Sequence, residues 1–132
     1  MLAAVATALA VAGAFHPWPL GFALYHGYLP LQGRITGHDD VLPGMASKCV
    51  NCHDAVRSDV APAIVIAPLT KASLTEPVSR RGGPPTVYAE SSFCSLLRDG
   101  VDPALVIVNR TMPRFAMADS DCHALWRYVS SR

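Results

Sequence analysis

The stretch KCVNCHD, residues 48–54, decides how the rest of this sequence is interpreted. It places Cys49 and Cys52 three positions apart, with His53 directly after the second cysteine. C-x-x-C-H is the attachment signature for c-type haem. Two thiols on one helical turn add across the two vinyl groups of the porphyrin as thioethers, and the adjacent imidazole then reaches the iron. The stretch therefore predicts one covalent haem c, with His53 as the proximal iron ligand.

Two other uses of a cysteine pair remain as alternatives. A structural zinc site needs a second pair of ligands, whereas Cys94 and Cys122 lie far apart and without ligand-pair spacing. A thioredoxin-like dithiol is expected within a βαβ pattern, and the sequence shows none. The residues favour haem attachment over a zinc or dithiol protein without haem.

Length and charge limit the class of protein. The chain has 132 residues, which is enough for one small domain and one modest core. Lys and Arg together number 11 and Asp and Glu number 10, so the net charge is +1. Nucleic-acid binders usually carry a basic stripe, and this balance does not predict one.

Residues 1–14, MLAAVATALAVAGA, form an uncharged apolar run that ends in Ala12, Gly13 and Ala14. Small residues at these positions fit the cleavage site of a secretory signal, although the basic region that normally precedes the run is missing. We expect export to the periplasm after residue 14. The alternatives are a membrane anchor that continues uncleaved through HPWPLGFALY, residues 16–25, and a buried N-terminal segment.

Proline and glycine divide the remaining chain into short elements. We expect a lead-in over residues 15–38 and a haem-binding domain over 39–132. Within that domain, the predicted helices run from Pro43 into the attachment stretch, over TKASL (70–74), over 89–99 with Gly100 as the stop, and from an Asp119 cap to the end. The fold class predicted from this pattern is all-α, small and loop-rich, wrapped around one haem.

The C-terminal half carries two further apolar patterns. Cys122, Leu125, Trp126 and Val129 follow the spacing of one buried helix face. The apolar run at residues 105–108 is either a short strand or a turn that faces the core.

A haem held by His53 has either a sixth ligand or an open distal site. The candidate ligands are Met112, Met117, Met45, His26, His38 and His123. Met112 is favoured because Pro113 stiffens its loop and a thioether stabilises ferrous iron. Met117 is the alternative methionine. Met45 is too near the attachment stretch for its side chain to reach the opposite face of the haem ring. An open site would instead serve small-ligand sensing or peroxide chemistry.

The segments CVNCHD, APLT, RRGGPP and TMPRF, followed by DCHALWRYV, together resemble single-haem cytochromes c of the class I type over about residues 40–131. The resemblance implies that a proximal-loop proline carbonyl, best matched by Pro68 and less well by Pro62, accepts the Nδ1 proton of His53. It also implies a glycine and an aromatic residue in the first helix, where the last helix packs. LPGMASKC offers Gly44 without an aromatic residue, so we expect this helix crossing to differ.

The remaining polar and sulfur residues have two interpretations each. Arg80, Arg81 and Tyr88 either bind the haem propionates or form a solvated basic turn. Cys94 and Cys122 either form a disulfide, as an oxidising compartment favours, or remain separate buried thiols.

Filled axial positions on the iron predict an electron carrier and not an enzyme. Its partners would be redox proteins, either a dehydrogenase donor or an oxidase acceptor. A basic rim would steer an acidic partner, unless it is only a solvated face. The residues of this rim are Lys48, Arg57, Arg80, Arg81 and Arg114.

Overall fold

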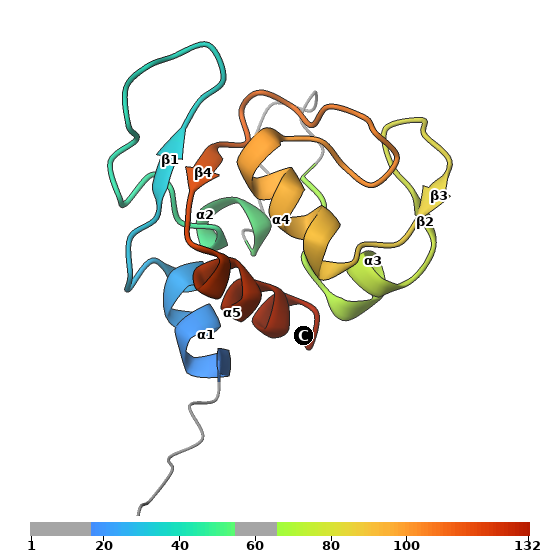
Figure 1. The fold of residues 1–132 in the computed structure, drawn as a ribbon, viewed down its shortest axis with the longest axis horizontal. Coiled ribbons are helices and arrows are strands. Elements are labelled where there is room, and N and C mark those ends of the chain that lie inside the picture. The colour runs from blue at the N-terminus through green and yellow to red at the C-terminus, as the bar shows by residue number, and fades with distance from the viewer. Residues whose placement is uncertain (1–16, 55–65) are drawn as a thin grey trace, which may run out of the picture.

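The structure is a computed structural model that describes residues 17–54 and 66–132 (Figure 1). The predicted signal segment 1–14, Pro62 and Arg57 lie outside the described residues. The helices are α1 (Pro17–His26), α2 (Val50–His53), α3 (Lys71–Thr75), α4 (Glu90–Asp99) and α5 (Asp119–Val129). The strands are β1 (Gln32–Arg34), β2 (Val78–Ser79), β3 (Pro85–Thr86) and β4 (Arg114–Ala116).

The prediction of an all-α domain is wrong, because the chain also forms two small antiparallel sheets. β1 pairs with β4, with Gly33 opposite Phe115, and β2 pairs with β3. The β2–β3 hairpin turns through Arg81 and Gly82, which have φ angles of 50° and 77°. β1 and β4 come from opposite ends of the described chain, so no local sequence pattern marks their pairing. The fold is therefore mixed, with helices around the core and sheets at its margins.

A close contact between α1 and α5 forms the base of the molecule (Figure 1). A Cβ atom on Gly21 would lie 2.1 Å from the carbonyl oxygen of Ala124 and 2.7 Å from Cβ of Tyr128. Only glycine lets the two helices approach this closely. One turn further along α1, Tyr25 is fully buried, and its ring centroid lies 5.4 Å from that of Tyr128. The helix that packs on α5 through a glycine and an aromatic residue is therefore α1, which precedes the predicted attachment helix.

Residues 17–38, the described part of the lead-in expected over 15–38, contribute to the core of the fold. Leu24 and Leu31 are buried beside Tyr25 in the central hydrophobic cluster. Residues of the alternative anchor, HPWPLGFALY, thus form much of a helix that packs on α5. In the parts of the chain that the structure covers, no helix has both the length and the hydropathy needed to cross a membrane.

The predicted helices near the C-terminus are confirmed in place and in buried face. α4 buries Phe93, Leu96 and Leu97, and Gly100 ends it with a φ of 75°. α5 buries Cys122, Leu125 and Val129, and the half-buried Trp126 packs its ring 5.4 Å from that of Phe93. The predicted Asp119 cap is wrong. Ala118 occupies the cap position, and Asp119 instead accepts a hydrogen bond from Arg98 at 2.6 Å.

The brief helix predicted around TKASL is confirmed as α3, but the attachment helix is shorter than predicted. Pro43 begins only a turn, in which the Ala46 amide donates to the Pro43 carbonyl at 2.8 Å, and α2 starts at Val50. Proline and glycine at 43 and 44 are poor helix formers, which accounts for the late start.

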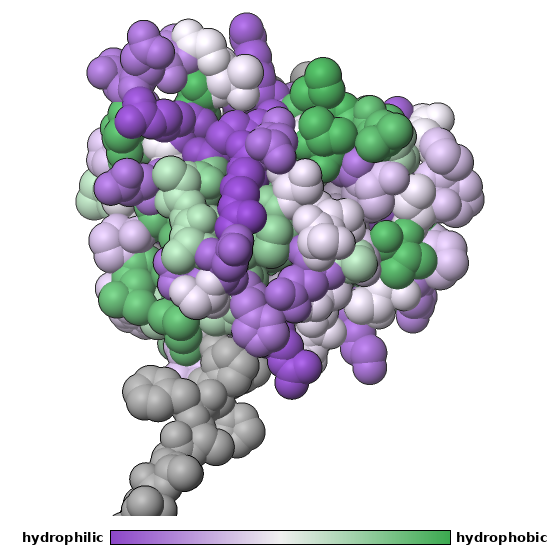
Figure 2. All heavy atoms as spheres, viewed as in Figure 1, coloured by the Kyte–Doolittle hydropathy of each residue, from purple (hydrophilic) through white to green (hydrophobic). Residues whose placement is uncertain are grey.

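The apolar run at 105–108 belongs to a turn and not to a strand, with one isolated bridge between Val101 and Ile107. The buried Asp102 carboxylate holds the turn by accepting hydrogen bonds from the amides of residues 104 and 106. Only Val108 faces the core, while Leu105 and Ile107 are 84% and 74% exposed. Figure 2 shows hydrophobic residues gathered over the loop between α4 and β4.

Candidate haem-attachment site

Cys49, Cys52 and His53 are brought together by the single turn of α2. The amides of Cys52 and His53 donate to the carbonyl of Cys49 at 3.2 and 3.0 Å. Cys49 is half-buried and Cys52 is exposed, and both are free thiols. The motif therefore presents two unbonded sulfur atoms and an imidazole from one turn of backbone.

The ring of His53 is oriented by a backbone carbonyl across the site. Its Nδ1 lies 2.8 Å from the carbonyl oxygen of Ala67, which accepts the Nδ1 proton and leaves the Nε2 lone pair free for a metal. The accepting residue differs by one position from the predicted Pro68, whose own carbonyl accepts from Ser73 Oγ at 2.6 Å. Pro68 still shapes the contact, because proline holds the residue before it in extended backbone.

Burial sets the protonation of the motif. Burial lowers the pKa of His53, and the hydrogen bond to the Ala67 carbonyl opposes that shift only in part. Burial also raises the pKa of the Cys49 thiol to about 12. Both groups are therefore neutral near pH 7, and neutral imidazole is the form that binds metals.

Asp54, the residue after the motif, ties the attachment turn to α1 and to the C-terminal residue Arg132. The hydroxyl of Tyr25 donates to the Asp54 carboxylate at 2.6 Å, and Arg132 donates to both carboxylate oxygens at 2.9 Å. The Arg132 guanidinium also lies 4.6 Å from the centre of the Tyr25 ring. Burial acts to raise the pKa of Asp54, but these two hydrogen bonds outweigh it and the pKa falls below its usual value.

We predict that Tyr25→Phe lowers the free energy of unfolding by about 1–2 kcal/mol, because it removes a hydrogen bond to a charged group. Urea unfolding of the purified protein measures the change. Tyr28→Phe is the matched control, since that side chain is 73% exposed and makes no hydrogen bond among the described residues. Equal unfolding curves for the two variants would show that the Asp54 contact contributes nothing.

Met112 lies in the loop that leads from α4 into β4, partly buried against the core. Its amide donates to the Asn109 carbonyl at 3.0 Å, and its carbonyl accepts from Arg114 Nη1 at 2.7 Å. The loop and the attachment stretch converge on Gly33 of β1. A Cβ atom there would lie 3.1 Å from Cβ of Pro113 and 3.3 Å from Cβ of Ser47. β1 thus joins the segment before Cys49 to the segment after Met112.

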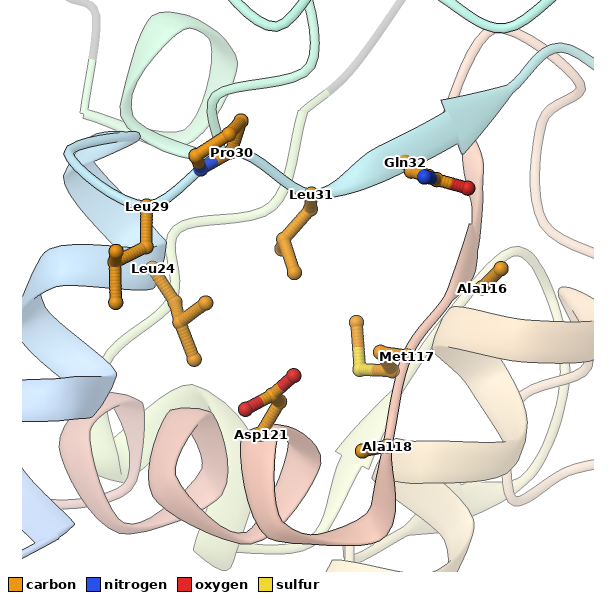
Figure 3. Close-up of a pocket in the computed structure, with 9 residues that line it drawn as sticks. All are labelled: Leu24, Leu29, Pro30, Leu31, Gln32, Ala116, Met117, Ala118 and Asp121. Atoms are coloured by element: carbon orange, nitrogen blue, oxygen red, sulfur yellow. The ribbon is translucent and has the colours of Figure 1, made fainter.

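The alternative methionine, Met117, has different surroundings. It lines a pocket of about 530 Å³ between α1, β1 and the start of α5. In Figure 3, Met117, Leu24, Leu31 and Asp121 point into a shared space. The described residues around this pocket include none from the CVNCH motif.

The other candidate ligands are engaged elsewhere or exposed. His26 Nε2 lies 3.2 Å from the hydroxyl of Tyr128, and His123 Nδ1 lies 3.0 Å from the Glu90 carboxylate. Met45 is 74% exposed, and His38 is also exposed.

Arg80, Arg81 and Tyr88 have partners within the protein. Arg80 donates to the backbone carbonyls of Ser73 and Thr86 and lies 4.7 Å from the centre of the Tyr88 ring. Arg81 pairs with Asp102 at 3.3 Å. These contacts link α3, the β2–β3 hairpin and the 100–113 loop. Propionate binding by these three residues stays a prediction.

The predicted pairing of Cys94 with Cys122 is present, with the sulfur atoms 1.93 Å and the Cα atoms 5.9 Å apart. It joins α4 to α5 and leaves Cys49 and Cys52 as the free cysteines. Among the described residues, no group of three or more His, Cys, Asp and Glu side chains is arranged to hold a metal ion.

Comparisons with family models, with curated proteins and with solved structures found no match to this chain. Interpretation of the site therefore depends on its residues and their geometry. The α1–α5 contact was not predicted, although G-x-x-x-Y at 21–25 and A-x-x-x-Y at 124–128 carry its signal. Residues at i and i+4, or i and i+3, lie on one helix face.

Proposed function

We propose that this chain is an electron-transfer protein that carries one c-type haem, related to the class I cytochromes c. In this proposal, Cys49 and Cys52 form the thioethers and His53 and Met112 are the axial ligands. The observation that carries it is the CVNCH turn, in which a backbone carbonyl binds Nδ1 of the histidine and leaves Nε2 available. The proposed partners are redox proteins, a dehydrogenase as donor or an oxidase as acceptor.

The residues present fit such a group. The motif supplies two free thiols on one turn, and the neutral imidazole of His53 is fixed in the tautomer that binds iron. Val50, Leu69 and Met112 pack around the core as partly buried apolar side chains, which suit a water-poor haem environment. When bound, haem supplies the one-electron Fe(III)/Fe(II) couple.

The α1–α5 crossing differs from the arrangement that the class I resemblance implied. That resemblance covers about residues 40–131 and places the glycine and the aromatic residue on the attachment helix, whereas Gly21 and Tyr25 lie on α1 and meet Ala124 and Tyr128. The proposal therefore rests on the CVNCH turn and not on this crossing.

Covalent attachment is the direct test. We expect protein produced with a haem-ligation machinery to keep its colour through denaturation in acid-acetone. Cys52→Ala should attach much less haem, and the double variant Cys49→Ala, Cys52→Ala should attach none, because no thiol remains to form a thioether. Absorbance of the denatured protein after gel filtration measures the attached haem.

The control is the double variant Cys94→Ala, Cys122→Ala, which removes the same number of cysteines from the α4–α5 disulfide. We expect it to retain the covalent haem. Wild-type protein that releases all colour into the solvent would overturn the proposed function.

A further inference from the structure

We propose that Arg114 is a positioning residue that holds Met112 in place as the distal ligand, an inference that rests on the proposed function. Its guanidinium donates from Nη1 to the Met112 carbonyl at 2.7 Å and from Nη2 to the Val108 carbonyl at 3.3 Å. One side chain therefore spans both ends of the five-residue segment 108–112.

A backbone hydrogen bond also attaches the segment 108–112 to the end of α4. The Val108 amide donates to the Gly100 carbonyl at 2.8 Å, and the Met112 amide donates to the Asn109 carbonyl at 3.0 Å. With Arg114 on the two carbonyls, both the amide and the carbonyl of Val108 and of Met112 have partners. The backbone around Met112 is thus fixed from several directions.

Gly100 makes room for this arrangement. A Cβ atom at Gly100 would lie about 2 Å from Nε, Cζ and Nη2 of Arg114, so the guanidinium lies directly against the glycine backbone. Gly100 also has a φ of 75°, which favours glycine. Gly100 therefore both ends α4 and leaves the space that the Arg114 guanidinium occupies.

Within the described part of the chain, the Arg114 guanidinium has no ion-pair partner. The side chain is half-buried, so the guanidinium is partly withdrawn from water. Placing a cation there is unfavourable unless its donors are used, and the donors are used on the carbonyls that flank Met112.

A lysine at position 114 cannot reproduce both hydrogen bonds to the carbonyls of Val108 and Met112. Its ammonium is a point charge, whereas the planar guanidinium presents two donors in a fixed fork. Arg114→Lys keeps the charge but loses one of the two carbonyl contacts. We therefore expect the 108–112 segment to open more readily in Arg114→Lys, and Met112 to compete less well with an added ligand.

The experiment compares ferric wild-type protein with Arg114→Lys and with Arg110→Lys, an exposed arginine of the same loop. Imidazole is the probe, followed by loss of the weak far-red methionine–iron band. We expect imidazole to bind about tenfold more tightly to Arg114→Lys and unchanged to Arg110→Lys, since a hydrogen bond to a charged group contributes about 1.5 kcal/mol or more. Amide hydrogen exchange should show faster exchange within 108–112 in Arg114→Lys, with α4 and α5 unchanged.

The outcomes separate the two proposals. Wild-type protein without covalent haem or without the far-red band would overturn the proposed function before any variant is compared. Wild-type protein with both, together with unchanged imidazole affinity in Arg114→Lys, would overturn the positioning role alone. If Arg114→Lys fails to fold, Arg114→Gln, which keeps one amide donor, is measured in its place. A loss of thermal stability without a change in imidazole affinity would show a structural role only.

Discussion

Replacing Met112 by alanine is expected to lower the reduction potential of the haem-loaded protein by on the order of 100 mV or more, because the axial ligands set haem potential over a wide range. A thioether is a soft ligand that favours the ferrous state, and its loss removes that preference. The same change should let the reduced protein bind carbon monoxide readily. A potentiometric titration and a carbon monoxide difference spectrum measure the two effects.

Met117→Ala is the matched control, because Met117 lines the pocket between α1, β1 and α5. We expect its potential to stay close to the wild-type value and its carbon monoxide binding to stay slow. If Met117→Ala lowers the potential and Met112→Ala does not, the distal ligand has been assigned to the wrong methionine. If neither variant changes the potential and the wild type already binds carbon monoxide, the distal site is open and the electron-carrier proposal fails.

The attachment turn was predictable because its chemistry is local. Three residues within five positions would supply the two thioethers and one ligand of the proposed haem, and a single turn of backbone brings them together. The faces of α4 and α5 were predictable for a similar reason, since helical periodicity is visible within one segment. The partner of His53 was predicted to within one residue, because a proline marks the loop but the neighbouring Ala67 supplies the carbonyl.

Contacts between distant segments were not predictable in this way. β1 pairs with β4 across about 80 residues of sequence, and neither three-residue strand carries a period that stands out. The role of Arg114 depends on that pairing, because β4 places its side chain against Gly100. Gly21 and Tyr25 do carry a signal, but the Gly- and Pro-rich stretch 27–44 that follows them predicts a loop-like lead-in.

The segment between α1 and α2 also connects the two sides of the proposed site. Ser47 Oγ donates to the Leu31 carbonyl at 3.0 Å, just before the attachment turn. Two residues after Leu31, Gly33 faces Phe115 and contacts Pro113, next to Met112. Displacement of α1 would therefore disturb both the proximal and the distal segments. The α1–α5 crossing is accordingly the contact on which the geometry of the site depends.

Gly21→Ala tests that dependence. Two opposing effects decide whether the substitution raises or lowers the free energy of unfolding. Alanine is a better helix former than glycine by about 1 kcal/mol, which would stabilise α1. The added Cβ, however, would lie 2.1 Å from the backbone carbonyl of Ala124, and backbone cannot move aside as a flexible side chain can. Overpacking of this kind costs about 1–3 kcal/mol and sometimes more. Because the obstacle is backbone, we expect the clash to dominate, with a net loss of about 2 kcal/mol in the free energy of unfolding.

Gly44→Ala is the control, because Gly44 is the glycine of LPGMASKC, where an aromatic partner for the glycine was missing. A Cβ there would lie 3.3 Å from Cβ of Pro30, a contact that a small shift relieves. We expect this variant to unfold within about 0.5 kcal/mol of wild type, as most substitutions away from tight contacts do. Urea unfolding of both haem-loaded variants gives the comparison. If Gly21→Ala is as stable as Gly44→Ala, α1 and α5 do not pack as closely as described.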